Sequence, residues 1–226
     1  MNDHPLDRAA WHALTTRLAH VAQGDARAVR MNPEYGQFSA PRDFTPENLE
    51  ALAALIPPHD IVSIAPTKPF TPPPGTRIVD ELILHQMLAD RLAVTAPDFP
   101  VMPLGDADAE EMRALATLTE PGPFLSRTHQ LGDFAGVRVD GKLVAMAGER
   151  LKLPGYTEIS AVCTHPDFRG RGYARGLMGL VSSKIAARGE TTLLHVVEDK
   201  KAEIAFYERL GFRFRRAITI ILLERA

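Results

Sequence analysis

The chain has 226 residues, of which 45% are hydrophobic and 24% charged, a balance that fits a folded globular protein and excludes a disordered tail or a fibre. Its formal net charge of −2 hides an asymmetry. Residues 1–120 carry 9 basic and 17 acidic side chains, whereas residues 121–226 carry 17 basic and 11 acidic ones. A basic second half indicates either an anionic ligand or a solvated surface.

Features that the sequence lacks indicate where the protein is located and which partners it does not need. Its single cysteine, Cys163, allows no intrachain disulfide, and its N-terminus lacks the basic and apolar regions of a secretory signal. No apolar run approaches the roughly 20 residues of a membrane span. Its eight histidines show no metal-ligand spacing. We therefore expect a cytoplasmic protein without a metal and without a membrane partner.

The first 98 residues give weak structural signals. Residues 11–21 place apolar side chains on one helical face, and residues 24–44 look irregular. Thr45-Pro46-Glu47 begins a predicted helix, because Thr is a favoured N-cap and Pro a favoured first residue. Residues 61–64 read as a strand, and residues 78–87 fit a strand or a helix. We predict an N-terminal α/β region over residues 1–98, whose role the sequence does not reveal.

Signals after residue 98 are sharper and predict one mixed α/β domain over residues 99–226. Apolar runs at 134–139 and 143–147 flank Asp140-Gly141, a two-residue turn that favours a β-hairpin. The remaining predicted elements are strands at 101–104, 158–164 and 192–197, helices from residue 108, after residue 172 and over 202–210, and one or two strands from Phe212.

The most informative segment is a glycine-rich turn between a predicted strand and a predicted helix, Arg169-Gly170-Arg171-Gly172-Tyr173-Ala174-Arg175. Glycines let successive backbone N–H groups converge on an anion at a helix N-terminus, where the helix dipole is positive. Three arginines add full charges. The turn lacks the Gly-Lys-Ser/Thr of a Walker motif and the third glycine of the dinucleotide fingerprint. A pyrophosphate is its expected ligand, and a turn with solvated arginines is the alternative.

These residues resemble the GNAT superfamily of N-acetyltransferases, whose signature is Gln/Arg-x-x-Gly-x-Gly/Ala after a strand. Arg169, Gly172 and Ala174 occupy that signature, preceded by His165-Pro166. A second family motif, a helix that ends in Tyr-Glu-x-Leu-Gly-Phe, corresponds to residues 207–212. The resemblance covers about residues 99–226, and within the superfamily the sequence resembles the branch that includes glycine N-acyltransferase-like proteins. Lys200 departs from the family, which often has Asn before the last helix.

The resemblance implies a mixed α/β fold: a central, mostly antiparallel sheet with two splayed parallel strands, flanked by helices, to which this chain adds its N-terminal extension. It implies acetyl-CoA as the acyl donor, bound between strands 158–164 and 192–197. The residues that match the family's cofactor site are Val162, Cys163, Thr164, Arg169, Gly170, Arg171, Gly172, Tyr173, Ala174, Arg175 and, at the departing position, Lys200. Lys200 could equally face solvent.

The same resemblance implies direct attack of an amine on the thioester. Tyr207 matches the tyrosine that protonates the leaving thiolate, and Glu158 is the expected base. Glu149, His129 and His195 are alternative bases. Cys163 is not expected to be a nucleophile, because it lies within an apolar strand. Phe124 and Arg127, in a loop that helps form the family's acceptor side, are candidate substrate residues; a rigid connector is the alternative reading.

The expected function is therefore acetyl-CoA-dependent N-acetylation of a small-molecule amine or amino acid. A non-catalytic acyl-CoA-binding or regulatory module is the alternative, because Lys200 replaces the usual Asn. A nucleic-acid partner is not expected, since the sequence shows no helix-turn-helix and no alternation of aromatic and basic residues. The acceptor, the acyl chain length and the oligomeric state, including a homodimer, stay open.

Overall fold

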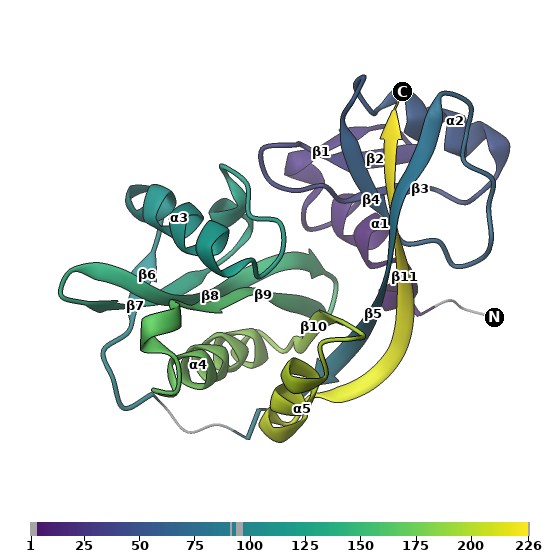
Figure 1. Cartoon of the computed structure of the whole chain (residues 1–226). Coiled ribbons are helices and arrows are strands. Elements are labelled where there is room, and N and C mark those ends of the chain that lie inside the picture. The colour runs from purple at the N-terminus through teal and green to yellow at the C-terminus, as the bar shows by residue number, and fades with distance from the viewer. Residues whose placement is uncertain (1–3, 91, 94–96, 226) are drawn as a thin grey trace.

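The computed structural model describes residues 4–90, 92–93 and 97–225. Its strands form an eight-stranded mixed sheet and a separate three-stranded sheet (Figure 1). In spatial order, the large sheet contains β4 (Ile61–Ile64), β11 (Arg213–Arg225), β5 (Thr76–Ala89), β10 (Thr191–Val197), β9 (Tyr156–Thr164), β8 (Lys142–Leu153), β7 (Phe134–Val139) and β6 (Met102–Leu104). The small sheet contains β1 (Ala22–Gly24), β2 (Ala28–Met31) and β3 (Ser39–Pro41).

Helices cover both faces of the large sheet, as the mixed α/β prediction requires. Helix α3 (Ala109–Thr119) lies on one face of β8 and β9, and α4 (Tyr173–Ala187) lies on the other (Figure 1). A strand points successive side chains to opposite faces, so Ala145 and Ala147 of β8 join the core under α4, while Met146 joins the core under α3. Helix α5 (Lys201–Leu210) follows β10. The predicted fold class is confirmed.

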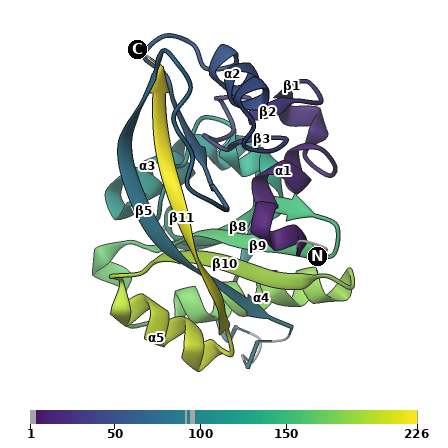
Figure 2. The same ribbon diagram turned by 90° about the vertical axis from the view of Figure 1, so that its right-hand side faces the viewer.

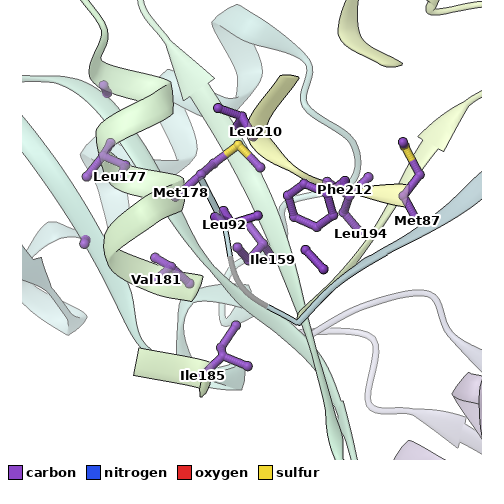
Figure 3. Close-up of a cluster of buried hydrophobic side chains, with 14 of the residues drawn as sticks. Met87, Leu92, Ile159, Leu177, Met178, Val181, Ile185, Leu194, Leu210 and Phe212 are labelled. Atoms are coloured by element: carbon purple, nitrogen blue, oxygen red, sulfur yellow. The ribbon is translucent and has the colours of Figure 1, made fainter. Parts of the chain in front are cut away.

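The core under α4 holds the large sheet and its helix together (Figure 3). Leu177, Met178, Val181 and Ile185 recur at helical spacing and point from α4 toward the sheet. Their partners come from strands far apart in the sequence: Met87 of β5, Ile159 of β9 and Leu194 of β10, all buried. Residues from both sides of position 98 therefore form one core.

The hairpin of β7 and β8 turns at the predicted place. Asp140 and Gly141 have positive φ angles of 49° and 79°, as the mirror-image turn of a two-residue hairpin requires. Phe134–Val139 pairs antiparallel with Lys142–Gly148. β8 pairs on its other side with β9, and β9 forms one wall of the site.

Strand β5 belongs to the first half of the chain but lies inside the large sheet. It pairs antiparallel with β10 on one side and with β11 on the other (Figure 2). Residues 78–87, which fit a strand or a helix in the sequence, are therefore a strand. The domain boundary expected near residue 98 falls between β5 and β6, and strands from both sides of it share this sheet.

The remaining N-terminal elements contact two different parts of the large sheet. The short helices η1 (Pro5–Arg8) and α1 (Ala9–Leu14) bury Leu6 and Leu14 against β8 and β10 residues, whereas α2 (Pro46–Ala54) packs with β2, β4 and β11. Residues 24–44, which look irregular in the sequence, contain β2 and β3. That expectation was wrong because strands of three or four residues are too short to show a period.

Among the described residues, four further short segments are 3-10 turns that connect these elements: η2 (Ala19–Val21), η3 (Asp106–Asp108), η4 (Thr128–Leu131) and η5 (Pro166–Phe168). Within the described ranges, no helix combines the length and the apolar character that a membrane-crossing helix needs.

Candidate active site

The site begins where two parallel strands separate. Tyr156–Glu158 of β9 pairs with Thr191–Leu193 of β10, and the two strands do not pair with each other beyond these residues, although both continue. The gap leaves backbone groups of both strands free to meet a ligand, in the way an added strand binds a sheet edge.

A cavity of about 700 Å³ occupies this gap. Its walls are Ile159–Thr164 of β9, Leu194–Val197 of β10, the glycine-rich turn and the first residues of α4, and the facing side chains of α5. Every residue predicted to bind the cofactor lines it: Val162, Cys163, Thr164, Arg169, Gly170, Arg171, Gly172, Tyr173, Ala174, Arg175 and Lys200. Both predicted catalytic residues, Tyr207 and Glu158, also line it.

A bulge interrupts β9 where it passes the cavity. Met146 pairs with Cys163 and Gly148 with Ser160, so β9 has one residue more than β8 over this stretch. Ala161 adopts a positive φ of 51°, which a residue with a side chain rarely adopts. A bulge leaves the extra residue outside the ladder and turns its backbone out of line. The strained backbone at Ala161 therefore lies in the cavity wall next to Val162, and strain of this kind is typical of functional sites.

The glycine-rich turn has the geometry of an anion-binding site. Gly170 and Gly172 have positive φ angles of 78° and 80°, and Gly172 is the N-cap of the 15-residue helix α4. The first N–H groups of a helix have no partner within the helix and carry partial positive charge. In the described part of the chain, the guanidinium groups of Arg169, Arg171 and Arg175 pair with no carboxylate. These three charges are available to an anionic ligand.

Two residues at the end of β9 have opposite environments. The Thr164 hydroxyl is buried and has no hydrogen-bond partner among the described residues, so a polar group of a ligand would satisfy it. Cys163 instead turns its side chain into the core under α3, and burial raises the pKa of its thiol to about 11. A thiol with such a pKa stays protonated at neutral pH and is a poor nucleophile.

Tyr207 approaches the cavity from α5. Burial, followed by the nearby charge of Glu203, raises the pKa of its phenol to about 12. The hydroxyl therefore keeps its proton at neutral pH, and it has no hydrogen-bond partner in the described ranges. Its ring contacts Phe206 and Phe212, with centroid distances of 5.5 and 6.1 Å, which hold it in place. The group is a free hydrogen-bond donor at the cavity wall.

Glu158 is a clamped carboxylate. Only 1% of its surface is exposed, and its two oxygens accept hydrogen bonds from Arg150 Nη2 and Nε at 2.9 and 3.0 Å, and from His195 Nδ1 at 2.7 Å. Burial opposes ionisation, but the charge of Arg150 and the hydrogen bonds from Arg150 and His195 outweigh it and hold the pKa of Glu158 well below its usual range. Such a group is a weak base and a strong hydrogen-bond acceptor.

His195 lies between this carboxylate and Gln86. Gln86 Oε1 accepts from Arg215 at 2.7 Å, and its Nε2 donates to the Leu6 carbonyl at 3.2 Å. These two contacts fix the orientation of the amide, because Arg215 can only donate and a carbonyl can only accept. Gln86 Nε2 therefore also donates to His195 Nε2, at 3.0 Å. It follows that His195 is neutral, with its proton on Nδ1 facing Glu158 and its lone pair on Nε2.

The other two alternative bases lie outside the cavity. Glu149 is fully buried and pairs with Lys152 and Arg188, both at 2.7 Å. His129 contacts Asp106 at 2.8 Å. Neither residue lines the cavity. Of the four candidates, only Glu158 and His195 reach the site, and they act there as a bonded pair.

The two residues predicted from the loop before β7 are also elsewhere. Phe124 packs against Phe134, with a centroid distance of 5.9 Å, and extends the core under α3. Arg127 stacks on the Tyr35 ring at 4.7 Å and pairs with Glu34 at 3.5 Å near the surface. Instead, Pro121 and Gly122 from the same loop line the cavity. The role expected for Phe124 and Arg127 therefore gains no support from their positions.

Two residues of the site, Arg150 and Gln86, were missed in the sequence analysis. Arg150 and Glu158 lie at similar distances along the chain from the turn at Pro154-Gly155. Such spacing places two side chains opposite each other in a hairpin, so the sequence could have predicted this ion pair. Gln86 offered no such signal, because it reaches His195 only through the pairing of β5 with β10.

Comparison with known proteins agrees with this geometry. The family model for FR47-like proteins matches residues 135–220. A crystal structure from Novosphingobium aromaticivorans, assigned to the GNAT family as an acetyltransferase, is 42% identical, with a TM-score of 0.91 over 99% of this chain and 100% of that one. A GCN5-related N-acetyltransferase from Kribbella flavida, 19% identical over 95% of this chain and 94% of that one, shares the fold with a TM-score of 0.60.

Among curated proteins, an acetyltransferase from Yersinia enterocolitica is 42% identical over 57 residues, which are 25% of this chain and 40% of that protein. The chain thus matches less than half the length of this relative. The match to the Novosphingobium protein, in contrast, spans both chains. The chain belongs to the GNAT family.

Proposed function

We propose that the protein is an acyl-CoA-dependent N-acyltransferase that moves an acetyl group from acetyl-CoA to a primary amine of a small molecule, in a complex that holds both substrates. The observation that carries the proposal is the cavity between β9 and β10, which has unpaired arginines at one helix end and a proton donor, Tyr207, with a neutral histidine, His195, on its walls.

The residues of the cavity fit acetyl-CoA. The helix N-terminus at Gly172 and the unpaired Arg169, Arg171 and Arg175 would hold the pyrophosphate. The unpaired edge of β9 and the buried Thr164 hydroxyl would hydrogen-bond to the pantetheine arm. A backbone N–H near the bulge at Val162 would stabilise the negative charge that develops on the thioester oxygen.

The reaction is a direct displacement. The amine nitrogen attacks the thioester carbonyl carbon, a carbon–nitrogen bond forms, and the carbon–sulfur bond then breaks to release the CoA thiolate. Tyr207 donates its proton, or a hydrogen bond, to that sulfur and recovers a proton from water. The products are the amide, CoA thiol and one proton. Holding both reactants in line supplies much of the rate.

His195 is the base in this proposal, with Glu158 as its positioning residue. An ammonium group replaces Gln86 as the donor to the Nε2 lone pair, and a charged donor makes the stronger hydrogen bond. His195 accepts one proton there, and the Glu158 carboxylate stabilises the resulting imidazolium through Nδ1. This assignment revises the expectation that Glu158 itself removes the proton.

Release of CoA thiol from acetyl-CoA, screened over amines, amino acids, polyamines, aminoglycosides and peptide N-termini, tests the proposal. We expect turnover with at least one class, and we expect Tyr207→Phe to lower kcat about a hundredfold while CoA still binds with unchanged Kd. Tyr156→Phe is the control, because Tyr156 does not line the cavity and its hydroxyl contacts His4. CoA binding without thiol release for any class would support the alternative, a non-catalytic acyl-CoA-binding module.

A further inference from the structure

A second cavity of about 280 Å³ adjoins the first one. It lies between the N-terminal elements and the sheet: η1, the segment before β3, and strands β4, β5 and β11 contribute its walls. Five residues line both cavities, namely Pro121, Gly122, Arg150, His195 and Val197. The two cavities therefore meet at His195.

The walls away from His195 are mostly apolar. β5 and β11 each direct alternate side chains inward, and these meet apolar residues of η1 and β4; examples are Leu6, Ile64, Leu82, Leu84, Ile220 and Leu222. The cavity is at the lower end of the volumes of ligand sites, about 300 Å³. Its size and lining suit the body of a small apolar molecule.

Charges in the second cavity argue against a polycation. Among its described lining residues, Asp7 and Arg150 are the charged ones. Asp7 accepts from Arg215 at 2.7 Å and from Arg216 at 2.8 Å, and Arg150 is bonded to Glu158. No lining carboxylate is therefore left for a second ammonium group. A single ammonium finds its proton acceptor at the shared end, on His195.

We propose that this second cavity is the acceptor site, and that the acceptor is a small molecule with one primary amine and an apolar aryl or branched alkyl body. The inference rests on the proposed function and names its substrate class. The body fills the space between η1, β4, β5 and β11, where its burial supplies the binding energy. The amine lies at the shared end beside His195, facing the cavity of the acyl donor.

Steady-state kinetics with the full-length protein test the substrate class. We expect 2-phenylethylamine and 3-methylbutylamine to exceed spermidine and kanamycin at least tenfold in kcat/KM. In the series ethylamine to pentylamine, kcat/KM is expected to rise about fourfold with each methylene group, which is the ratio for burying one such group. Higher kcat/KM for the polyamine or the aminoglycoside would overturn the inference and leave the proposed function intact.

A pair of matched variants tests the location. Ile220→Trp fills the cavity from β11, and Ile83→Trp puts the same side chain on the exposed outer face of the neighbouring strand β5, where Ile83 is 45% exposed. We expect Ile220→Trp to raise KM for 2-phenylethylamine at least tenfold with an unchanged KM for acetyl-CoA, and Ile83→Trp to change neither. An unchanged amine KM in folded Ile220→Trp would place the acceptor elsewhere.

Binding supplies a readout that does not depend on turnover. Calorimetric titration of 2-phenylethylamine into protein saturated with CoA is expected to give a measurable Kd that Ile220→Trp weakens at least tenfold. Absence of binding to the wild-type protein would contradict the acceptor site. Binding without thiol release would instead contradict the proposed function, so the two failures are distinguishable.

Discussion

At the scale of single residues, the site is organised by one hydrogen-bonded chain that links Arg215, Gln86, His195, Glu158 and Arg150. Each contact restricts the next one. Arg215 orients the amide of Gln86, the amide leaves a lone pair on His195 Nε2, and Glu158 holds the ring through Nδ1. A positioned, neutral imidazole at the meeting point of two cavities is the result.

This arrangement predicts a pH-dependent defect in His195→Gln. The variant is expected to lower kcat/KM for the amine about a hundredfold at pH 7, because the ammonium loses its proton acceptor. The defect is expected to shrink as the pH approaches the pKa of the amine, about 10, because free amine then needs no base. A pH-rate profile of both proteins measures the ratio, and His129→Gln, outside both cavities, is the matched control. A ratio that stays constant with pH would indicate a structural role only.

Glu158 also predicts a pH-dependent stability. Because its pKa is lowered in the folded state, the carboxylate contributes stability that is complete above its ordinary pKa of 4.5 and is lost as the pH falls below that value. Glu158→Gln is expected to lower the free energy of unfolding by about 3 kcal/mol at pH 7, since it leaves Arg150 without its buried partner. The difference in the free energy of unfolding between the variant and the wild type is expected to narrow between pH 5 and pH 3. Urea denaturation at each pH measures it, and Glu34→Gln, at an exposed 3.5 Å pair, is the control.

At the scale of elements, the turn before α4 carries the charge for donor binding. Arg169→Ala and Arg175→Ala are each expected to raise KM for acetyl-CoA about tenfold with little change in kcat, as loss of one charge-assisted hydrogen bond requires. Lys184→Ala is the control, because Lys184 is an exposed cation of the same helix that does not line the cavity. Equal effects of all three changes would indicate only a general loss of positive charge.

Elements also differ in how well their sequences predict them. The β7–β8 hairpin, the glycine-rich turn and α4 follow from local signals, namely Asp140-Gly141, two glycines and an apolar helical face. β2 and β3 carry no such signal, because they are held by pairing and burial rather than by their own period. The contact between Glu158 and His195 is equally invisible in the sequence: it joins strands separated by α4 and depends on their short parallel pairing. Local chemistry is predictable here, and contacts made by the topology are not.

At the scale of the whole molecule, the opposite charges of the two halves have a structural cause. Acidic residues of the first half pair with arginines of the second: Asp7 with Arg215 and Arg216, Asp90 with Arg213, and Asp108 with Arg138. Part of the charge of each half is thus neutralised by ion pairs that join the two halves. The arginines of the turn before α4 are left over for an anionic ligand.

The shared sheet predicts that the second half does not fold alone. A chain consisting of residues 99–226 lacks β5, so β10 and β11 lose the strand that lies between them. The core under α4 also loses Met87, which is fully buried. We expect this fragment to lack the cooperative thermal transition and the near-ultraviolet circular dichroism of the full chain. A cooperatively folded fragment that binds CoA would show instead that the boundary near residue 98 separates independent domains.

The position of β5 has a consequence for the order of events during synthesis. β5 leaves the ribosome before its neighbours β10 and β11, which follow it by more than one hundred residues. Its pairing with them must wait until they are made, and contacts between such distant segments form slowly. β11 also supplies Ile218, Ile220 and Leu222 to the second cavity. The wall that β11 gives to the second cavity is therefore the last part of the site to be synthesised.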